Sequence, residues 1–399
     1  MLKVITMSEA EEMLRSKFKA LCLSETVPLP ESFGRVLSED IIAEENIPPA
    51  DRSMVDGYAV RACDTFGASE AIPALLHLQG EISMGEMPAE PIREHCCMKI
   101  PTGGFLPKGA DGAVMIEHTD LLPDGVVSIR KPAAPGSHLA FCGDDMRKGQ
   151  HILKAGSVID VGETGTLAAM GQYAVPVTKK VKVALFSTGD EIIEIDKTVT
   201  GGQMRDVNRH ALKALIEKMG GTAEDFGIIP DDEEKLREAV IKGIQSCDMV
   251  VFSGGTSAGA RDFAEKILSE EGEILWHRVA VKPDKPTLAA SVLGKPVLAL
   301  PGHPMAACLI FMILGKEAMC VLEGRESREK NIYAEISQSV SANDGRELIL
   351  PVHLSGEKAE PIRSKSGLIT KLSEADGYVI IGRNCEGIHA GEKVKVTLF

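Results

Sequence analysis

Strands and helices alternate between residues 181 and 322, and this alternation restricts the possible fold more than any other feature of the chain. The segment "VKVALFST" (181–188) is a continuous apolar run, typical of a strand buried on both faces. Amphipathic helical segments and further apolar runs follow it, up to "PMAACLIFMILGKEAM" (304–319). The series predicts a central, doubly wound α/β domain with a mostly parallel sheet covered by helices on both faces.

The flanking segments predict β structure. Residues 46–145 alternate Gly- and Pro-rich turns with short apolar runs, and residues 326–399 return to short strands such as "EKVKVTLF". They predict a β-rich domain and a small C-terminal β-barrel or sandwich. The remaining residues, 1–45 with 146–180, are expected to form an elongated domain, and 181–325 the α/β domain. The chain is thus expected to be a multidomain α/β plus β protein.

Two short helices are predicted outside the α/β segment. "SEAEEMLRSKFKA" (8–20) is amphipathic, with Ser8 as a possible N-cap and Glu11 three residues later, which is capping-box spacing. A run of small residues predicts the second helix, from about Gly162 to Met170.

Charge and composition exclude several classes of function. The formal net charge of −14 disfavours nucleic-acid binding, which needs cationic surfaces. Nine scattered cysteines without a CxxC pair fit neither a disulfide framework nor a zinc site, so a reducing cytoplasm is expected. No apolar stretch is judged to reach the roughly 20 residues of a membrane span, so no membrane partner is expected either.

Polar, Gly and Pro residues follow the predicted α/β strands, where open α/β sheets bind ligands. Glu191 follows "VALFST", and Asp231 and Asp232 follow "FGII". The stretch "GGTSAGARD" follows "MVVFS", and "PGHP" follows "VLAL". Lys282 and Lys285 follow "VAV", which is also taken as a strand of this sheet.

These residue types suit a phosphorylated or nucleotidylated ligand. Glycines allow backbone N–H groups to approach an anion, and a helix N-terminus adds partial positive charge. Carboxylates beside an anion imply a cation between them, and Mg²⁺ prefers a few carboxylates with phosphate oxygens. The competing interpretation is that Asp231 or Asp232 only caps the next helix, that the glycine stretch is a tight turn and that the lysines are solvated.

Several segments, in this order, resemble the molybdopterin molybdenumtransferase family, which includes bacterial MoeA and the gephyrin E domain. They are "SMVDGYAV" (53–60), "IPTGG" (100–104), "GDD" (143–145), "FSTGDE" (186–191), "GIIPDD" (227–232), "SGGTSAGARD" (253–262), "VKPDKP" (281–286) and "LPGHP" (300–304). The resemblance implies Mg²⁺-dependent insertion of molybdate into adenylylated molybdopterin, with release of AMP. It also implies a homodimer joined through the elongated domain, with each site shared between the α/β domain of one subunit and the β-rich domain of the other.

The resemblance assigns roles by position. The implied catalytic residues are Asp56, Glu191, Asp231, Asp262 and Lys282, and the implied Mg²⁺ ligands are Glu191, Asp231 and Asp262. The implied substrate contacts are Thr102, Asp145, Ser253, Gly254, Gly255, Ser257, Gly259, Arg278, Lys285, Pro301, His303, Pro304, Arg346 and Ser366. Taken alone, Asp56 and Asp145 are equally consistent with ordinary turn residues.

Two departures from the family pattern leave alternatives open. "PGHPMA" stands where "PGNPVS" is usual, and Ala140 stands where an Arg is usual. A paralogue that uses tungstate, or a non-catalytic cofactor-binding scaffold, therefore remains an alternative to the molybdate enzyme. A nucleotide pyrophosphatase is a third possibility, although it would not need "VDGYA" or "PTGG". An adenylyltransferase and molybdoenzymes are the expected protein partners.

Overall fold

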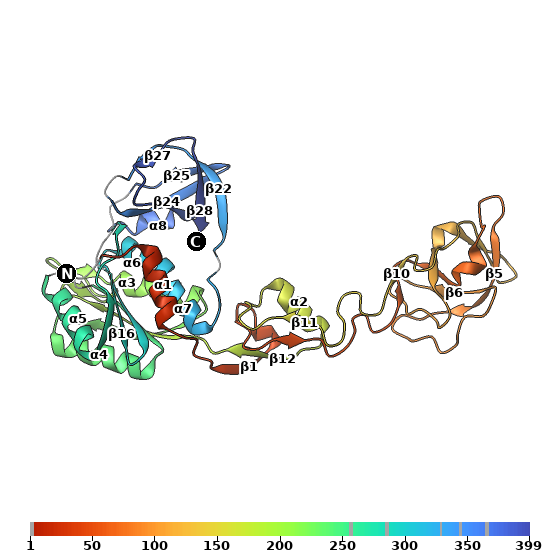
Figure 1. Ribbon diagram of the computed structural model, residues 1–399, viewed down its shortest axis with the longest axis horizontal. Helices are drawn as coiled ribbons and strands as arrows, with labels where there is room; N and C mark the ends of the chain where they lie inside the picture. Colours follow the sequence, from red (N-terminus) through yellow and green to blue (C-terminus); the bar gives the residue numbers. More distant parts are fainter. Residues whose placement is uncertain (1–3, 255–257, 284–286, 328, 343–344, 364–366) are drawn as a thin grey trace.

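The computed structural model describes residues 4–254, 258–283, 287–327, 329–342, 345–363 and 367–399. The molecule is elongated, with an α/β unit and a C-terminal β unit at one end and a β-rich unit at the other (Figure 1). A thin middle segment, in which the chain runs out and back, joins the two ends (Figure 1).

The α/β unit is built on a six-stranded sheet. Its order is β16 (Thr222–Ile229), β13 (Lys182–Thr188), β17 (Met249–Gly254), β21 (Lys295–Leu300), β20 (Leu288–Val292) and β18 (Gly272–Trp276). The first four strands are parallel, and β20 runs antiparallel to both of its neighbours, β21 and β18. The predicted mostly parallel sheet is confirmed, although β18 and the reversed strand β20 were not predicted.

Helices cover both faces of this sheet. The helix α4 (Glu233–Ser246) and the helix α5 (Ala258–Glu271) pack on one face, where Phe186 and Phe252 stack in the core. The other face is covered by α3 (Asn208–Lys218), α6 (Pro304–Ile310) and α7 (Lys316–Glu323), with a π-helical turn at Phe311–Gly315 between the last two. Burying such side chains stabilises the fold by about 1.5–3 kcal/mol each.

The first helix differs from expectation both in its cap and in the unit to which it belongs. The helix α1 spans Met7–Lys17 and is capped by Thr6 with Glu9, two residues before the expected Ser8 and Glu11. Thr6 accepts the Glu9 N–H and Glu9 accepts the Thr6 N–H, so this pair satisfies both backbone donors. Ala10 and Leu14 of α1 are buried in the α/β core, so this helix lies with the α/β unit rather than with the middle segment.

The helical stretch Pro304–Glu323 is, contrary to expectation, long and apolar enough to cross a membrane. However, 83% of its most apolar window is buried inside the protein. It contacts α1 and α3 and therefore serves as a core helix of the α/β unit.

Short antiparallel pairs make up the middle segment. Strand β1 (Ser24–Pro28) pairs with β12 (Ala174–Thr178), and β2 (Ile41–Ile42) pairs with β11 (His151–Leu153). The helix α2 spans Val161–Ala169, close to its predicted bounds, and buries only Leu167.

The β-rich unit at the far end is a second six-stranded sheet. Its order is β7 (Gly112–Met115), β4 (Gly57–Val60), β6 (Cys96–Ile100), β5 (Ala74–Glu81), β9 (Val126–Ile129) and β8 (Thr119–Leu121). A separate pair, β3 (Arg52–Ser53) with β10 (Leu139–Ala140), connects it to the middle segment.

The C-terminal unit is a closed five-stranded barrel. It contains β22 (Asn331–Ile336), β24 (Glu347–Ser355), β25 (Lys358–Pro361), β26 (Gly377–Ile381) and β28 (Lys393–Leu398). The pair β23 (Val340–Ser341) and β27 (Gly387–Ile388) and the short helix α8 (Thr370–Ser373) complete it.

The strand β19 (Val281–Lys282) corrects one sequence expectation. It pairs with β24 of the barrel and is not a strand of the α/β sheet. The apolar run "VAV" therefore connects the two units instead of ending at the ligand-binding edge of the sheet.

Candidate active site

The carboxyl ends of three parallel strands converge around Thr188. This residue is paired with Ile229 on one side and with Gly254 on the other. Its hydroxyl donates a hydrogen bond to Asp231 Oδ1 at 3.0 Å, and the Asp231 N–H donates to Asp190 Oδ1 at 3.2 Å. Two acidic side chains from different strand ends are thus held together at this edge.

Helix capping is performed by Asp232 and not by Asp231. Asp232 is the N-cap of α4, and its side chain accepts the Lys235 N–H at 3.0 Å. The alternative in which Asp231 or Asp232 caps the next helix is therefore confirmed for Asp232 and wrong for Asp231. Asp231 instead lies against Thr188 at the strand ends, where a ligand of the sheet edge would bind.

Two glycines allow unusually close approach at this edge. A Cβ added to Gly254, whose φ is +123°, would lie 1.9 Å from the Thr188 carbonyl oxygen. A Cβ added to Gly189, with φ +144°, would lie 2.8 Å from Glu191 Oε2, so the Glu191 carboxylate folds over the end of β13. Neither position tolerates a side chain. Ser253 is buried, and its Oγ has no hydrogen-bond partner among the described residues.

Part of the expected site lies outside the described residues, namely Gly255, Ser257, Lys285, Ser366 and the side chain of Asp262. Gly259 lies in the first turn of α5.

The described ranges contain no group of three or more His, Cys, Asp or Glu side chains able to hold a metal ion. Glu191 and Asp231 nevertheless fit Mg²⁺, which binds through one or two carboxylates when phosphate oxygens complete its shell. Asp231 supports this fit, because capping does not engage it.

The loop "PGHP" is fixed to the sheet edge by Asn208. Its side-chain amide donates to the Gly302 carbonyl at 2.8 Å, and the Asn208 side chain is almost completely buried. Pro301 is buried, and Pro304 occupies the first turn of α6, where its missing N–H costs nothing. The two prolines thus shape the loop, and Asn208 holds it in place.

Asn208 itself is positioned by a buried ionic cluster. Asp206 Oδ1 accepts hydrogen bonds from Ser187 Oγ at 2.8 Å and from the Arg209 backbone N–H at 3.1 Å. The Arg209 guanidinium pairs with Asp206 at 3.0 Å and with Asp225 at 2.8 Å. Burial alone would lower the pKa of Arg209, but the neighbouring carboxylates raise it overall, so this side chain stays charged.

The barrel is joined to the α/β unit through β19. The Glu347 N–H donates to the Ala280 carbonyl at 2.9 Å, which places half-buried Arg346 beside the segment that carries half-buried Lys282. Exposed His303 is also near the barrel, since a Cβ added to Gly367 would lie 3.8 Å from its Cδ2. Exposed Arg278 precedes this segment and anchors the N-terminus, because its carbonyl accepts the Ile5 N–H at 3.2 Å.

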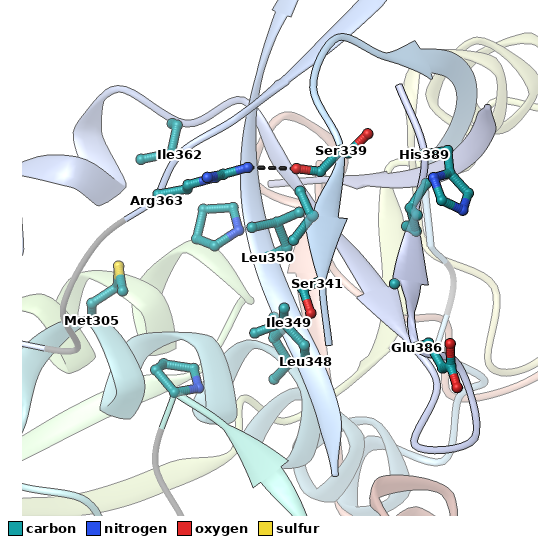
Figure 2. Close-up of a pocket in the computed structure, with 15 residues that line it drawn as sticks. Met305, Ser339, Ser341, Leu348, Ile349, Leu350, Ile362, Arg363, Glu386 and His389 are labelled. Atoms are coloured by element: carbon teal, nitrogen blue, oxygen red, sulfur yellow. Dashed lines mark hydrogen bonds between the residues drawn. The ribbon is translucent and has the colours of Figure 1, made fainter. Parts of the chain in front are cut away.

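A cavity of about 780 Å³ lies between the helix α6, which follows the PGHP loop, and the barrel (Figure 2). Pro283 and Met305 line it from the α/β side. Arg363 extends across the barrel side and donates to the Ser339 carbonyl (Figure 2). The remaining polar lining comes from Ser341, Glu386 and His389. The volume suits a small organic ligand.

The expected contributions of the β-rich unit lie far from this edge within one chain. Asp56 Oδ1 accepts the Thr102 N–H at 2.7 Å, so these two residues form one exposed turn. Asp145 is exposed near the base of the same unit, where its N–H donates to the Ile47 carbonyl. Figure 1 shows the β-rich unit at the opposite end of the molecule from α4, α5 and β16. A single chain therefore does not bring the two sets together.

Comparisons with known proteins match almost the whole length of the chain. Residues 5–171 match the MoeA N-terminal region (domain I and II), residues 184–319 a molybdopterin binding domain, and residues 333–399 the MoeA C-terminal region (domain IV). The molybdopterin molybdenumtransferase of Haemophilus influenzae is 30% identical, with 99% of each chain covered. The chain belongs to the MoeA family of molybdopterin molybdenumtransferases.

Other relatives agree with this membership. The molybdopterin molybdenumtransferase of Bacillus subtilis is 29% identical over 94% of this chain and 90% of its own length. The crystal structure of a molybdopterin biosynthesis MoeA protein from Pyrococcus horikoshii OT3 covers 100% of both chains, with 30% identity and a TM-score of 0.89. The expected multidomain α/β plus β fold is thus confirmed.

Several residues of this MoeA-family site escaped the sequence analysis. Asn208 begins α3 and Asp206 precedes that helix, and neither follows a strand that the sequence predicted. Arg363 immediately precedes the "SKSG" segment, so the neighbourhood of Ser366 could have revealed it. The departure Ala140 lies in β10 of the distant unit, whereas the departure His303 faces the barrel.

Proposed function

We propose that this MoeA-family enzyme inserts molybdate into adenylylated molybdopterin with Mg²⁺ and releases AMP. The observation that carries the proposal is the strand-end cluster of Thr188, Asp190 and Asp231, where Asp231 is spared from helix capping. The names of the relatives support the pterin and the metal as substrates. Glycine backbone and Lys282 would offset negative charge on the adenylyl phosphate.

The acids of this edge have defined roles in the proposal. Glu191, Asp231 and Asp262 would hold Mg²⁺, which would neutralise phosphate charge when bound. Thr188 orients Asp231 through its hydroxyl. Ser257 would bind ligand through the loop, Ser253 would contact it from the end of β17, and neither serine would act as a nucleophile. The cavity beside Arg363 would receive the part of the ligand that faces the barrel.

Release of AMP tests this proposal. Purified protein is incubated with adenylylated molybdopterin, Mg²⁺ and either molybdate or tungstate, and AMP is quantified. We expect Glu191→Gln to lower kcat by about 100-fold or more with either oxyanion. The exposed Glu234→Gln in the first turn of α4 serves as a matched control and should leave kcat unchanged. Absence of AMP above background would contradict the enzyme proposal and favour a scaffold, whereas faster turnover with tungstate would identify a tungstate paralogue.

We also propose that two copies share each active site, joined through the middle segment. The arrangement is supported by the position of the β-rich unit, which contains Asp56, at the opposite end of the molecule from the α/β unit (Figure 1). It is also supported by large apolar side chains that the middle segment exposes. These are Leu23, Val161 and Tyr173.

Mixing two inactive variants tests the shared site. Asp56→Ala and Glu191→Gln chains, mixed in equal amounts and re-equilibrated, should regain about a quarter of wild-type activity, since half of the dimers then carry one intact site. A mixture that remains inactive while forming heterodimers would refute sharing.

We place the protein in the cytoplasm, and we propose an adenylyltransferase that supplies the substrate and molybdoenzymes that accept the product. The free state of all nine cysteines is compatible with a reducing compartment.

A further inference from the structure

A second crevice lies on the opposite edge of the α/β sheet from the candidate active site. Its volume is about 570 Å³, and it includes Lys180 and Gly220. These residues directly precede β13 and β16, which are paired through Lys182 and Thr222 at their amino ends. The crevice therefore cannot share a ligand with the carboxyl-end site around Thr188.

Three structural units form this crevice. The middle segment contributes Phe33 to Val36, the α/β unit contributes the ends of α3 and α7, and the barrel contributes Tyr378 and Leu398. The middle segment approaches the α/β unit here, since a Cβ added to Gly220 would lie 3.9 Å from the Gly34 carbonyl oxygen. The middle segment forms an arm that carries the β-rich unit, and this arm leaves the rest of the molecule at the crevice (Figure 1).

The floor of the crevice is apolar and partly aromatic. Leu215 and Leu398 line it, and the rings of Tyr378 and Phe399 are 5.9 Å apart. Phe33 lines the crevice and is nevertheless 64% exposed. A flat apolar group could bury area against these side chains.

The walls carry an excess of positive charge, in a chain whose net charge is −14. Two acids line the crevice, Glu217 and Glu323. Glu323 is buried and pairs with Arg325 at 2.5 Å, so its charge is already compensated. The basic lining residues are Arg35, Lys180, Lys218, Lys316, Arg325 and Lys330.

Three of these cations remain to attract a ligand. Lys180, Lys218 and Lys330 are exposed, and no carboxylate among the described residues lies within ion-pair distance of them. They come from the start of β13, the end of α3 and the start of the barrel. Their positive field therefore converges on the crevice from two of the three units.

We propose that this crevice binds a small amphiphilic anion, with an aromatic body on the Tyr378–Phe399 floor and a phosphate, sulfonate or carboxylate group beside the lysines. Such a ligand would contact the arm, the α/β unit and the barrel together. Bound ligand would hold the arm in one orientation relative to the α/β unit. Any effect of the bound anion on the rate of AMP release would rest on the proposed shared site, whereas binding of the anion does not.

Fluorescence titration with 8-anilinonaphthalene-1-sulfonate, an aromatic sulfonate, tests the proposal on the full chain. The double variant Lys218→Glu/Lys330→Glu should raise the Kd of the probe by about tenfold or more, because two attractive charges become repulsive. The control Lys179→Glu/Lys213→Glu makes the same change in charge outside the crevice and should alter the Kd by less than about twofold. AMP release without effector should stay unchanged in both variants.

Three results would overturn the proposal. Equal losses of affinity in both double variants would show a general charge effect. Loss of probe binding in Arg363→Ala would place the probe in the other cavity. Binding that disappears as protein concentration rises would show that a second copy of the chain covers the crevice. Inactive protein that still binds the probe in the expected pattern would refute the proposed function and leave this inference intact.

Discussion

Replacing Gly254 by alanine should distort the α/β sheet at the candidate site. The new Cβ would stand 1.9 Å from the Thr188 carbonyl oxygen, whereas real Cβ atoms essentially never approach within 3.0 Å. The obstacle is backbone, so rotation of a side chain cannot relieve it. Strands β13 and β17 would have to separate by roughly 1 Å at their carboxyl ends, and a closely packed core cannot absorb such a shift without losing contacts.

The cost of this substitution has two parts. The φ of +123° is a region that favours glycine, and holding alanine there costs about 1–3 kcal/mol. Breaking one or two ladder hydrogen bonds beside Thr188 adds about 1 kcal/mol each. We expect a total of about 2–5 kcal/mol, which lowers the unfolding midpoint of the α/β unit by about 10 °C.

Differential scanning calorimetry of the full chain measures this loss, and AMP release measures the accompanying loss of activity. Gly202→Ala is the matched control, because its added Cβ would meet nothing within 4 Å. It should leave both readouts unchanged. If Gly254→Ala unfolds within about 2 °C of the wild type, strands β13 and β17 do not approach as described and the reasoning fails.

Three further predictions concern the surroundings of this edge. Asn208→Ala removes the donor to the half-buried Gly302 carbonyl, at a cost of about 1 kcal/mol. The value of kcat/KM for AMP release should fall, and Asn208→Asp, which cannot donate, should not restore it. Arg209→Met leaves the carboxylate of Asp206 buried without its cation, so urea unfolding should show a loss of about 3–5 kcal/mol. Burial raises the pKa of Cys97 and of Cys308 to about 12, and it is the largest cause of the rise in the pKa of Cys247 to about 11. These three thiols should therefore resist 5,5′-dithiobis(2-nitrobenzoic acid) at pH 8 until the protein unfolds. The exposed thiols should react first; they are Cys22, Cys63, Cys142 and Cys385.

The architecture of the α/β unit could be predicted because its signal is local. Buried parallel strands are nearly all apolar, and their helices show one apolar face, so periodicity alone identifies both. The run "VAV" was misplaced because two residues of extended chain look the same whichever sheet they join. Only the pairing of Val281 with Glu347, 66 positions away, assigns that strand to the barrel.

The site was predictable where chemistry follows a strand and unpredictable where it depends on tertiary contacts. Glu191 and Asp231 stand directly after strands, and the glycine at 254 is needed for a close approach of two backbones. The choice between Asp231 and Asp232 as the helix cap depends on the dihedral angles of two adjacent residues, which composition does not encode. Asn208 reaches Gly302 across 94 positions of sequence, and no local pattern marks such a pair.

The attachment of the β-rich unit has an evolutionary consequence. The chain enters and leaves this unit through neighbouring positions, since Ile47 is bridged to Met146 and its N–H donates to the Met146 carbonyl at 2.8 Å. A segment whose two ends are adjacent can be exchanged as a cassette without disturbing the scaffold that carries it. Asp56 and Thr102 lie within that exchangeable segment, whereas Glu191 and Asp231 lie outside it. Recombination could therefore replace one half of the proposed site while selection preserved the other.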